Sequence, residues 1–285
     1  MEKLVLTECP RDAMQGIITF IPTEKKVAYL NQLLQVGFDV LDFGSFVSPK
    51  AIPQMADTVE VLKALELEQS STQLLAIVAN ERGAQDASAF DEITYLGYPF
   101  SVSKTFQQRN TNASIEQSLQ RLEKIKQIAD ASNKKLMVYL SMAFGNPYGD
   151  AWSPEIVSDW SKRLHSDLGV EFLALSDTIG SAGEEEIRGL FTAIPKEVPQ
   201  VVVGAHLHAT PQDVKQKVKW AYESGCRRFD GALNGLGGCP MAKDDLTGNM
   251  ATEEMLSYFS EINLDLGLNR EALGKALEMI PNVFP

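Results

Sequence analysis

Two histidines, two positions apart, give the first indication of chemistry in this chain. His206 and His208 follow the apolar run at 201–205 and are two of only three histidines among 285 residues. The β-branched residues of that run predict a buried strand. Side chains two apart on a strand point to the same face, so both imidazoles could bind one metal ion. The alternative is a pair of hydrogen-bonded histidines that close the strand.

A carboxylate and a guanidinium near the N-terminus could complete such a site. Asp12 would make a mixed nitrogen and oxygen site, suited to Mn²⁺, Fe²⁺, Co²⁺ or Zn²⁺, or to Mg²⁺ with added water. Asp12 could instead cap a helix or accept a hydrogen bond in a loop. Arg11 is always charged and could stabilise a developing oxygen anion. It could also form a salt bridge to Asp42, and these two roles are compatible.

Cys239 lies in a glycine-dense loop that contains Gly235, Gly237 and Gly238. Glycines permit unusual backbone angles and a close approach to a ligand. A loop cysteine of this kind suits a proton donor or acceptor. The alternative is a small buried thiol, which is the fate we expect for Cys9 and Cys226.

Apolar runs and amphipathic stretches alternate along the chain. Strands are predicted at residues 3–7, 40–43, 73–79, 92–96, 136–141, 172–176, 201–206 and 228–232. Helices with one apolar face are predicted at residues 23–36, 114–131, 153–168, 212–224, 253–261 and 270–279. Thr23, Ser114 and Ser153 occupy expected N-cap positions, Ser114 and Gln117 fit a capping box, and residues 107–112 are expected to form a loop.

Eight strand and helix repeats predict parallel strands joined by right-handed crossovers. We therefore expect an α/β fold, a single (β/α)₈ TIM barrel over residues 1–285, with a C-terminal helical extension at about 252–285. The chemistry of such barrels lies at the C-terminal ends of the strands. The ends of strands 1, 2, 6, 7 and 8 should therefore share one rim.

Charge and cysteine content limit the possible partners. The net charge of −12 argues against non-specific binding of nucleic acid or of an anionic membrane. Three cysteines do not form a disulfide framework, and no apolar stretch is long enough to span a bilayer. A strand is predicted almost at the first residue, so we expect no targeting peptide and a cytoplasmic location.

Several motifs together resemble one enzyme family. They are Pro10-Arg11-Asp12-Ala13-Met14-Gln15, Ser45-Phe46-Val47-Ser48-Pro49-Lys50, Asn112-Ala113-Ser114-Ile115-Glu116, Ser176-Asp177-Thr178-Ile179-Gly180, the His-x-His pair and Gly235-Leu236-Gly237-Gly238-Cys239-Pro240. In this order they look like the 3-hydroxy-3-methylglutaryl-CoA lyases, from about residue 3 to Glu254. Those enzymes belong to a superfamily of metal-dependent lyase barrels that includes isopropylmalate and homocitrate synthases.

The resemblance implies a divalent metal, Mg²⁺ or Mn²⁺, and an acyl-CoA substrate that is cleaved to acetyl-CoA and acetoacetate. It implies leucine degradation as the pathway, and we expect a homo-oligomer, a dimer. The implied metal ligands are Asp12, His206, His208 and Asn249. The implied catalytic residues are Arg11, Cys239 and His206. Gln15, Asp42 and Ser45 match positions that line the family's site, and Lys50 and Lys243 are candidates by position for the CoA phosphates.

The chain departs from the family pattern at several positions that orient substrate. Ala13 replaces a glycine, Asp42 a glutamate and Ala209 an aspartate. The stretch between Cys239 and Asn249 is one residue longer than usual and reads Lys243-Asp244-Asp245-Leu246-Thr247 in place of a Gly-Ala-Ser-like run. The end of strand 5 reads Phe144-Gly145-Asn146-Pro147, where the family usually has cysteines. A related synthase that condenses acetyl-CoA with a 2-oxo acid is one alternative. A barrel that binds an acyl-CoA without catalysis is another.

Overall fold

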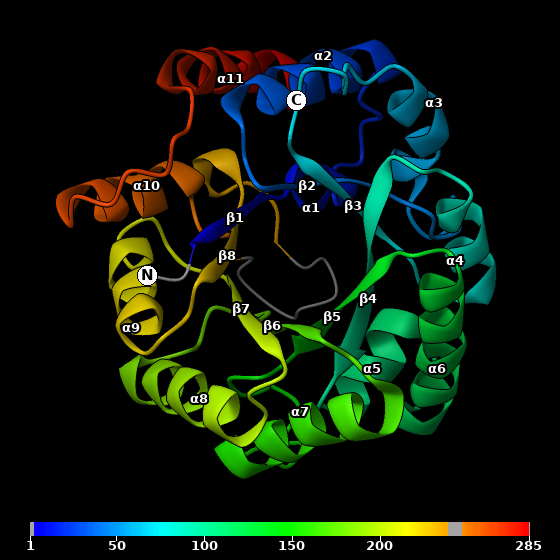
Figure 1. The fold of residues 1–285 in the computed structure, drawn as a ribbon, viewed down its shortest axis with the longest axis vertical. Coiled ribbons are helices and arrows are strands. Elements are labelled where there is room, and N and C mark those ends of the chain that lie inside the picture. The colour runs from blue at the N-terminus through cyan, green and yellow to red at the C-terminus, as the bar shows by residue number, and fades with distance from the viewer. Residues whose placement is uncertain (1–2, 239–246, 285) are drawn as a thin grey trace.

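The computed structural model describes residues 3–238 and 247–284, and these form a closed parallel barrel (Figure 1). The barrel strands are β1 (Val5–Glu8), β2 (Val40–Ser45), β3 (Gln73–Ile77), β4 (Ile93–Ser101), β5 (Lys135–Ser141), β6 (Phe172–Asp177), β7 (Val202–Leu207) and β8 (Arg228–Gly231). Each strand pairs with the next in parallel, and β1 pairs with β8. The predicted TIM barrel is confirmed, with all eight strands where the apolar runs placed them.

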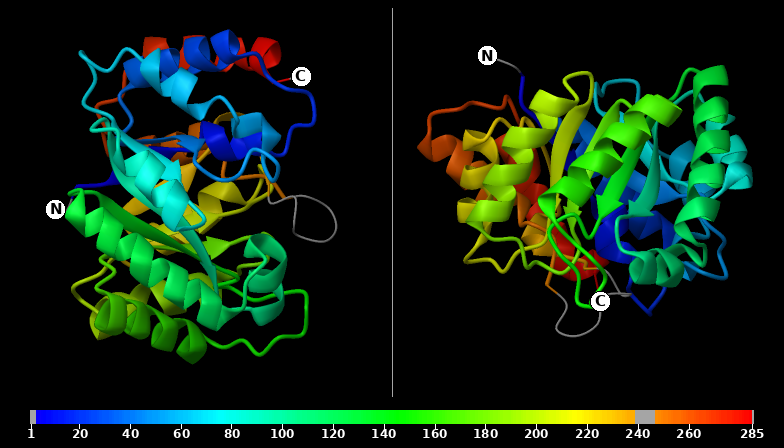
Figure 2. Two further views of the ribbon diagram at one scale, coloured as in Figure 1. Left: turned by 90° about the vertical axis from the view of Figure 1, so that its right-hand side faces the viewer. Right: turned by 90° about the horizontal axis from the view of Figure 1, so that it is seen from below.

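Helices surround the strands on every side (Figure 2). They are α1 (Pro10–Gln15), α2 (Thr23–Val36), α3 (Thr58–Lys63), α4 (Glu81–Ser88), α5 (Lys104–Thr111), α6 (Ile115–Ala131), α7 (Pro154–Leu168), α8 (Glu184–Glu197), α9 (Val214–Glu223), α10 (Thr252–Glu261) and α11 (Arg270–Val283), with short 3₁₀ turns η1 (Pro53–Met55) and η2 (Leu233–Gly235). The two predicted C-terminal helices are present as α10 and α11. Within the described residues, none of the helices has the length and apolar content needed to cross a membrane.

Two local predictions were wrong. The polar stretch 107–112 is mostly helical, because it belongs to α5, whose N-cap Ser103 accepts a hydrogen bond from the Phe106 N–H. The side chain of Gln107 is buried and accepts a hydrogen bond from the Ser101 N–H at 2.7 Å, so a tertiary contact supports a helix of low apolar content. Thr23 does not cap α2 but is its first residue.

The Thr23 hydroxyl instead donates a hydrogen bond to Asp57 at 2.7 Å, and Pro22 occupies the N-cap position. The other two caps are confirmed. Ser114 and Gln117 form the predicted capping box, and Ser153 accepts a hydrogen bond from the N–H of Ile156. Each satisfies N–H groups that a helix start leaves without an intrahelical partner.

The apolar core has a large outer part and a small inner part. The large cluster joins the outer face of the strands to the helices. The smaller cluster includes Leu75, Tyr95 and Tyr139, and Tyr139 packs edge-on to the His206 ring with centroids 5.2 Å apart. Because alternate strand residues face opposite sides, this smaller cluster fills the barrel on the face that carries His206. The polar residues at the mouth of the barrel lie above this inner apolar cluster.

A buried carboxyl group ties the first strand to the turn η2 and to the first residue of α10. Glu8 in β1 accepts hydrogen bonds from the Leu233 N–H at 2.8 Å and from the Thr252 hydroxyl at 2.6 Å. Burial raises the pKa of Glu8 to about 8, against the lowering effect of these two hydrogen bonds. The carboxyl group therefore retains its proton in the folded state at a pH where it is ionised in the unfolded chain.

We expect this proton to make stability depend on pH. Because the folded pKa of Glu8 is about 8 and the ordinary pKa of a glutamate is 4.5, the contribution of Glu8 to stability is complete below the lower value and is lost as pH rises through the higher one. Glu8→Gln mimics the neutral form. The wild-type free energy of unfolding should fall relative to that of Glu8→Gln by roughly 4 kcal/mol between pH 5 and pH 8.5.

Urea titrations across this pH range measure the difference. The control is Glu60→Gln, which changes an exposed glutamate of α3 and should follow the wild-type curve at every pH. Parallel pH profiles for wild type and Glu8→Gln would show that Glu8 ionises normally in the folded protein.

Candidate metal and acyl-CoA site

Three predicted ligands meet at the mouth of the barrel. One ligand atom from each of Asp12, His206 and His208 lies within 4.8 Å of the other two. Asp12 comes from α1 directly after β1, His206 from β7, and His208 from just beyond the end of β7. Both Asp12 and His208 are buried. The structure thus brings together residues that are almost 200 positions apart in the sequence, and their donor set could hold a divalent cation.

The carboxylate of Asp12 is held on both oxygens. Oδ1 accepts hydrogen bonds from Arg11 Nη1 at 2.9 Å and from Gln15 Nε2 at 2.7 Å, and Oδ2 accepts one from Asn249 Nδ2 at 2.8 Å. Burial alone would raise the pKa of Asp12, but Arg11 and the two imidazoles lower it below the ordinary value. Asp12 is therefore ionised and fixed in orientation, as a metal ligand must be.

Asn249 lies beside this carboxylate. Besides the bond to Asp12, its Nδ2 donates to the Leu236 carbonyl oxygen at 2.8 Å. Its backbone pairs with His208 as an isolated antiparallel bridge, which fixes the segment that follows residues 239–246 against the end of β7. The structure therefore brings the fourth predicted ligand to the same place as the other three.

Each histidine is oriented through its Nδ1 atom. Nδ1 of His206 lies 3.3 Å from Asp230 Oδ2, and Nδ1 of His208 lies 3.0 Å from the Thr247 carbonyl oxygen. When these Nδ1 atoms carry the ring protons, Nε2 of each ring is the atom available to an ion. Burial lowers the pKa of both rings, but Asp230 raises that of His206 above its ordinary value, whereas His206 lowers that of His208 further.

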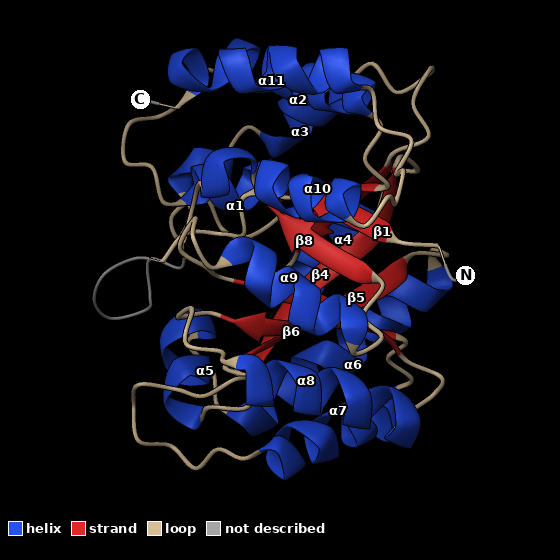
Figure 3. Cartoon of the chain, turned by 90° about the vertical axis from the view of Figure 1, so that its left-hand side faces the viewer, coloured by secondary structure: helices blue, strands red, loops and turns tan. Residues whose placement is uncertain are grey.

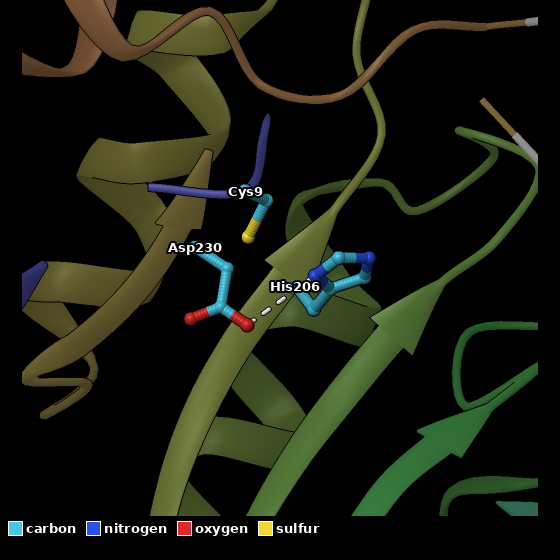
Figure 4. Close-up of side chains that lie close together, drawn as sticks. All are labelled: Cys9, His206 and Asp230. Carbon is cyan, nitrogen blue, oxygen red and sulfur yellow. Dashed lines mark hydrogen bonds and ion pairs between the residues drawn. The ribbon is translucent and has the colours of Figure 1, made fainter. Parts of the chain in front are cut away.

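Asp230 was missed in the sequence. It lies in β8, is 3 % exposed, and belongs with Cys9 and His206 to a second group whose ligand atoms lie within 4.8 Å of one another (Figure 4). Its position two residues after Arg228, on the inward face of a predicted strand, was the available signal.

The expectation that Cys9 and Cys226 are buried thiols is confirmed. Burial, together with nearby carboxylates that include Asp230, raises the pKa of Cys9 well above its ordinary value.

Arg11 makes the salt bridge proposed as its alternative role and also faces the site. Nε donates to Asp42 Oδ2 at 3.0 Å, Nη2 donates to the same oxygen, and Nη1 donates to Asp12 and to Gln15 Oε1. Burial lowers the pKa of Arg11, but the two aspartates raise it to a net value above the ordinary one. Burial raises the pKa of Asp42 to about 6 despite the opposing effect of Arg11.

A cavity of about 160 Å³ opens in front of these residues. Its lining includes Arg11, Asp12, Gln15 and both ligand histidines, together with Phe106, Asn110 and Thr111 of α5 and Tyr139 of β5. The Tyr139 hydroxyl is buried and has no hydrogen-bond partner among the described residues. A buried hydroxyl without a partner is rare and marks a place where a bound molecule can supply one.

Two other predicted residues, Ser45 and Lys50, do not line this cavity. Ser45 is buried but is not in the cavity wall, because its hydroxyl bonds to the Ile77 carbonyl oxygen at 3.4 Å and to the Val47 N–H at 3.2 Å. Lys50 is exposed in the loop after β2 and does not line the cavity. Cys239 and Lys243 lie outside the described residues.

A buried lysine behind His208 was also missed. Lys217 of α9 donates to Asp177 Oδ2 at 3.0 Å, to the Gly180 carbonyl oxygen at 2.9 Å and to the His208 carbonyl oxygen at 2.8 Å. In the sequence, Lys217 occupies an inward position of an amphipathic helix, where an apolar residue is usual. The apolar periodicity of the helix did not indicate that a lysine at this position would have three hydrogen-bond acceptors.

We expect Asp230→Asn to weaken metal binding. The amide retains the size of the side chain but no longer offers a carboxylate to the His206 Nδ1 proton, so the ring loses its preferred tautomer and orientation. The dissociation constant for Mn²⁺, measured by electron paramagnetic resonance titration, should rise roughly 10–100-fold. Asp39→Asn is the control, because Asp39 pairs with exposed Lys3 and bonds the Leu6 N–H at the opposite end of β1. Equal affinity in wild type and Asp230→Asn would contradict the orienting role.

Comparison with known proteins agrees with this geometry. Residues 5–280 match the HMGL-like family. The chain is 33% identical over 273 residues to the cytoplasmic 3-hydroxy-3-methylglutaryl-CoA lyase of Rattus norvegicus, covering 95% of this chain and 78% of that protein. It is 33% identical to the mitochondrial hydroxymethylglutaryl-CoA lyase of Mus musculus, covering 95% of this chain and 82% of that protein.

Solved structures give the same result. The HMG-CoA lyase of Bacillus subtilis superposes with a TM-score of 0.91 at 31% identity, over 99% of this chain and 94% of that one. An HMG-CoA lyase of Acinetobacter baumannii, in complex with coenzyme A and 3-methylmalate, superposes with a TM-score of 0.90 at 30% identity, over 99% of this chain and 91% of that one. The chain therefore belongs to the HMGL-like family.

Proposed function

We propose that this protein is a divalent-metal-dependent lyase that cleaves 3-hydroxy-3-methylglutaryl-CoA to acetyl-CoA and acetoacetate. The observation that carries the proposal is the convergence of Asp12, His206 and His208 at the mouth of the barrel. Family membership and the lyase names of the relatives support it. The complex of the Acinetobacter baumannii relative with coenzyme A supports an acyl-CoA as substrate.

The metal proposed here is Mg²⁺ or Mn²⁺, held by Asp12, His206 and His208 with the amide oxygen of Asn249. Carboxylate, amide and imidazole donors without a thiolate ligand fit these ions. For Asn249 to bind through oxygen, its carboxamide would have to present Oδ1 to the ion while Nδ2 stays on Asp12 and Leu236. When bound, the ion supplies Lewis acidity that favours ionisation of a coordinated substrate hydroxyl.

The chain's own residues would then move one proton from oxygen to carbon. A base beside the ion takes the proton of the tertiary hydroxyl. This base is a water next to His206 when Nε2 of the ring holds the ion, or His206 itself when Nε2 is free, in which case Asp230 stabilises the charged ring. The C2–C3 bond breaks, and its electron pair becomes the enolate of acetyl-CoA. The guanidinium of Arg11 is held in place by Asp42 and Asp12, and its positive charge stabilises the enolate oxygen. Cys239 donates its thiol proton to C2, which completes acetyl-CoA, and the resulting thiolate regains a proton from the base that deprotonated the hydroxyl.

The walls of the cavity would orient the substrate. The unpartnered Tyr139 hydroxyl is placed to bond a substrate oxygen beside His206, with which its ring packs. Gln15 lines the same cavity and is held against Arg11 and Asp12. Lys50 and Lys243 remain candidates for the CoA phosphates, on the basis of their positions in the sequence.

We also propose a cytoplasmic location and a dimeric assembly. Cys9 and Cys226 are free thiols, which supports a reducing compartment, and the named relatives include cytoplasmic and mitochondrial enzymes. Light scattering on the purified protein tests the assembly.

A product assay tests the proposed reaction. Incubation with 3-hydroxy-3-methylglutaryl-CoA and Mn²⁺ should release acetoacetate and acetyl-CoA in equal amounts. Chelation should abolish product formation, because the carboxylate and imidazoles cannot supply the Lewis acidity of the ion, and added Mg²⁺ or Mn²⁺ should restore it. Release of free CoA thiol from acetyl-CoA and a 2-oxo acid, without cleavage of the lyase substrate, would assign the protein to the synthases.

Cys239→Ala tests the proton donor. Removing one positioned catalytic group commonly costs about 10²–10³ in kcat, and we expect a loss in this range with unchanged Mn²⁺ affinity. Cys226→Ala is the matched control, because the Cys226 thiol is buried and donates to the Arg228 carbonyl oxygen at 3.1 Å, on the strand rather than in the cavity. If Cys239→Ala has the same kcat as Cys226→Ala, another group protonates the enolate.

A further inference from the structure

One charged side chain close to the candidate metal ligands has no part in the reaction proposed above. Lys217 projects from α9 to the end of β7, and its side chain is only 5 % exposed. An ammonium group has three N–H donors, and Lys217 has three acceptors at 2.8–3.0 Å: one carboxylate oxygen and two backbone carbonyl oxygens. Burying a charge is costly unless it is fully paired in this way, so the contacts specify the position of Nζ closely.

The three acceptors belong to segments that meet behind His208. Asp177 ends β6 and also accepts hydrogen bonds from the N–H groups of Ser181 and Ala182, which fixes the turn after β6. The His208 N–H donates to the Asp177 carbonyl oxygen at 3.3 Å, and the His208 carbonyl oxygen accepts from Lys217. Both backbone polar groups of His208 are therefore held by the pair of Asp177 and Lys217.

The same turn supports the imidazole of His208. Gly180 has a positive φ of 72°, and a Cβ at this position would lie 2.7 Å from Thr247 Cγ2. The Thr247 hydroxyl donates to the Ile179 carbonyl oxygen at 3.4 Å, and the Thr247 carbonyl oxygen faces His208 Nδ1. Lys217 holds the turn against which Thr247 packs, and Thr247 in turn orients the ring.

We propose that Lys217 is a positioning residue that fixes the backbone position of His208 and the orientation of its ring at the metal centre. It bonds neither the ring nor any of the candidate donor atoms, and it acts through the His208 carbonyl oxygen and through the turn at 177–182. The inference rests on the proposed metal centre, but it is independent of which acyl-CoA the enzyme cleaves.

The sign of the effect separates positioning from simple electrostatics. Coulomb's law predicts that removing a cation near a metal site strengthens the binding of Mn²⁺. Loss of positioning predicts the opposite, because removal of an outer partner of a metal ligand commonly weakens metal affinity by about 10–100-fold. A variant of Lys217 that folds normally and binds Mn²⁺ more weakly can therefore be explained by geometry and not by charge.

The test compares Lys217→Met with Lys215→Met in the full chain. Lys215 lies on the same helix, is half-exposed, and pairs with Glu261 at 2.8 Å, so its removal changes the net charge equally without touching the turn. We expect the Mn²⁺ dissociation constant, measured by electron paramagnetic resonance without acyl-CoA, to rise roughly 10–100-fold for Lys217→Met. It should change by less than about twofold for Lys215→Met, and the Co²⁺ absorption spectrum should shift only in Lys217→Met.

A double variant covers the case in which Lys217→Met fails to fold because Asp177 is left buried and unpaired. Lys217→Met combined with Asp177→Asn removes both charges of the pair and should show the same weakened Mn²⁺ binding with a wild-type circular dichroism spectrum. Unchanged or tighter binding in the folded variant overturns the positioning role. Wild-type protein that binds Mn²⁺ but does not cleave the lyase substrate overturns the proposed function and leaves this inference standing.

Discussion

The buried carboxylate of Asp12 is the charge on which the mouth of the barrel depends. A lone carboxylate in this position would be too costly to keep ionised. It is stabilised because Arg11, Gln15 and Asn249 donate hydrogen bonds to it and two imidazoles lie nearby. These partners come from the first helix, the seventh strand and the segment before α10, so a single ionised group brings the two ends of the chain to one rim.

Arg11 shows how one side chain can serve both structure and chemistry. Its bonds to Asp42 join α1 to β2, and its bonds to Asp12 and Gln15 fix the carboxylate that faces the cavity. In the family pattern the acid of strand 2 is a longer glutamate. The shorter Asp42 still reaches the guanidinium at normal hydrogen-bond distance.

The parts of the fold that follow from local pattern were predictable, and the parts that depend on barrel closure were not. Apolar runs located all eight strands, and the His-x-His spacing placed two imidazoles on one face because the strand period is two. Residues 107–112 were misjudged because their helix is supported by a tertiary contact through Gln107 rather than by an apolar face.

Asp230 and Lys217 were missed for a similar reason. Each is a charged residue within a segment of ordinary periodicity, and its partner comes from another strand or turn. Asp230 lies 24 positions from His206, and Lys217 lies 40 positions from Asp177. Motif similarity identified the residues expected to touch the metal and the substrate. It could not identify those that hold them, because no spacing rule connects them along the chain.

The packing of α11 on α2 has a consequence for biosynthesis. The two helices lie side by side at one edge of the molecule (Figure 3), and the Ala272 carbonyl oxygen accepts a hydrogen bond from Gln32 at 2.9 Å. The apolar surface of α2 is thus covered by α11, a helix that is synthesised much later. Until β8 and then α11 are synthesised, the edge of β1 and the apolar surface of α2 stay exposed, and such nascent intermediates are the species that aggregate or engage chaperones.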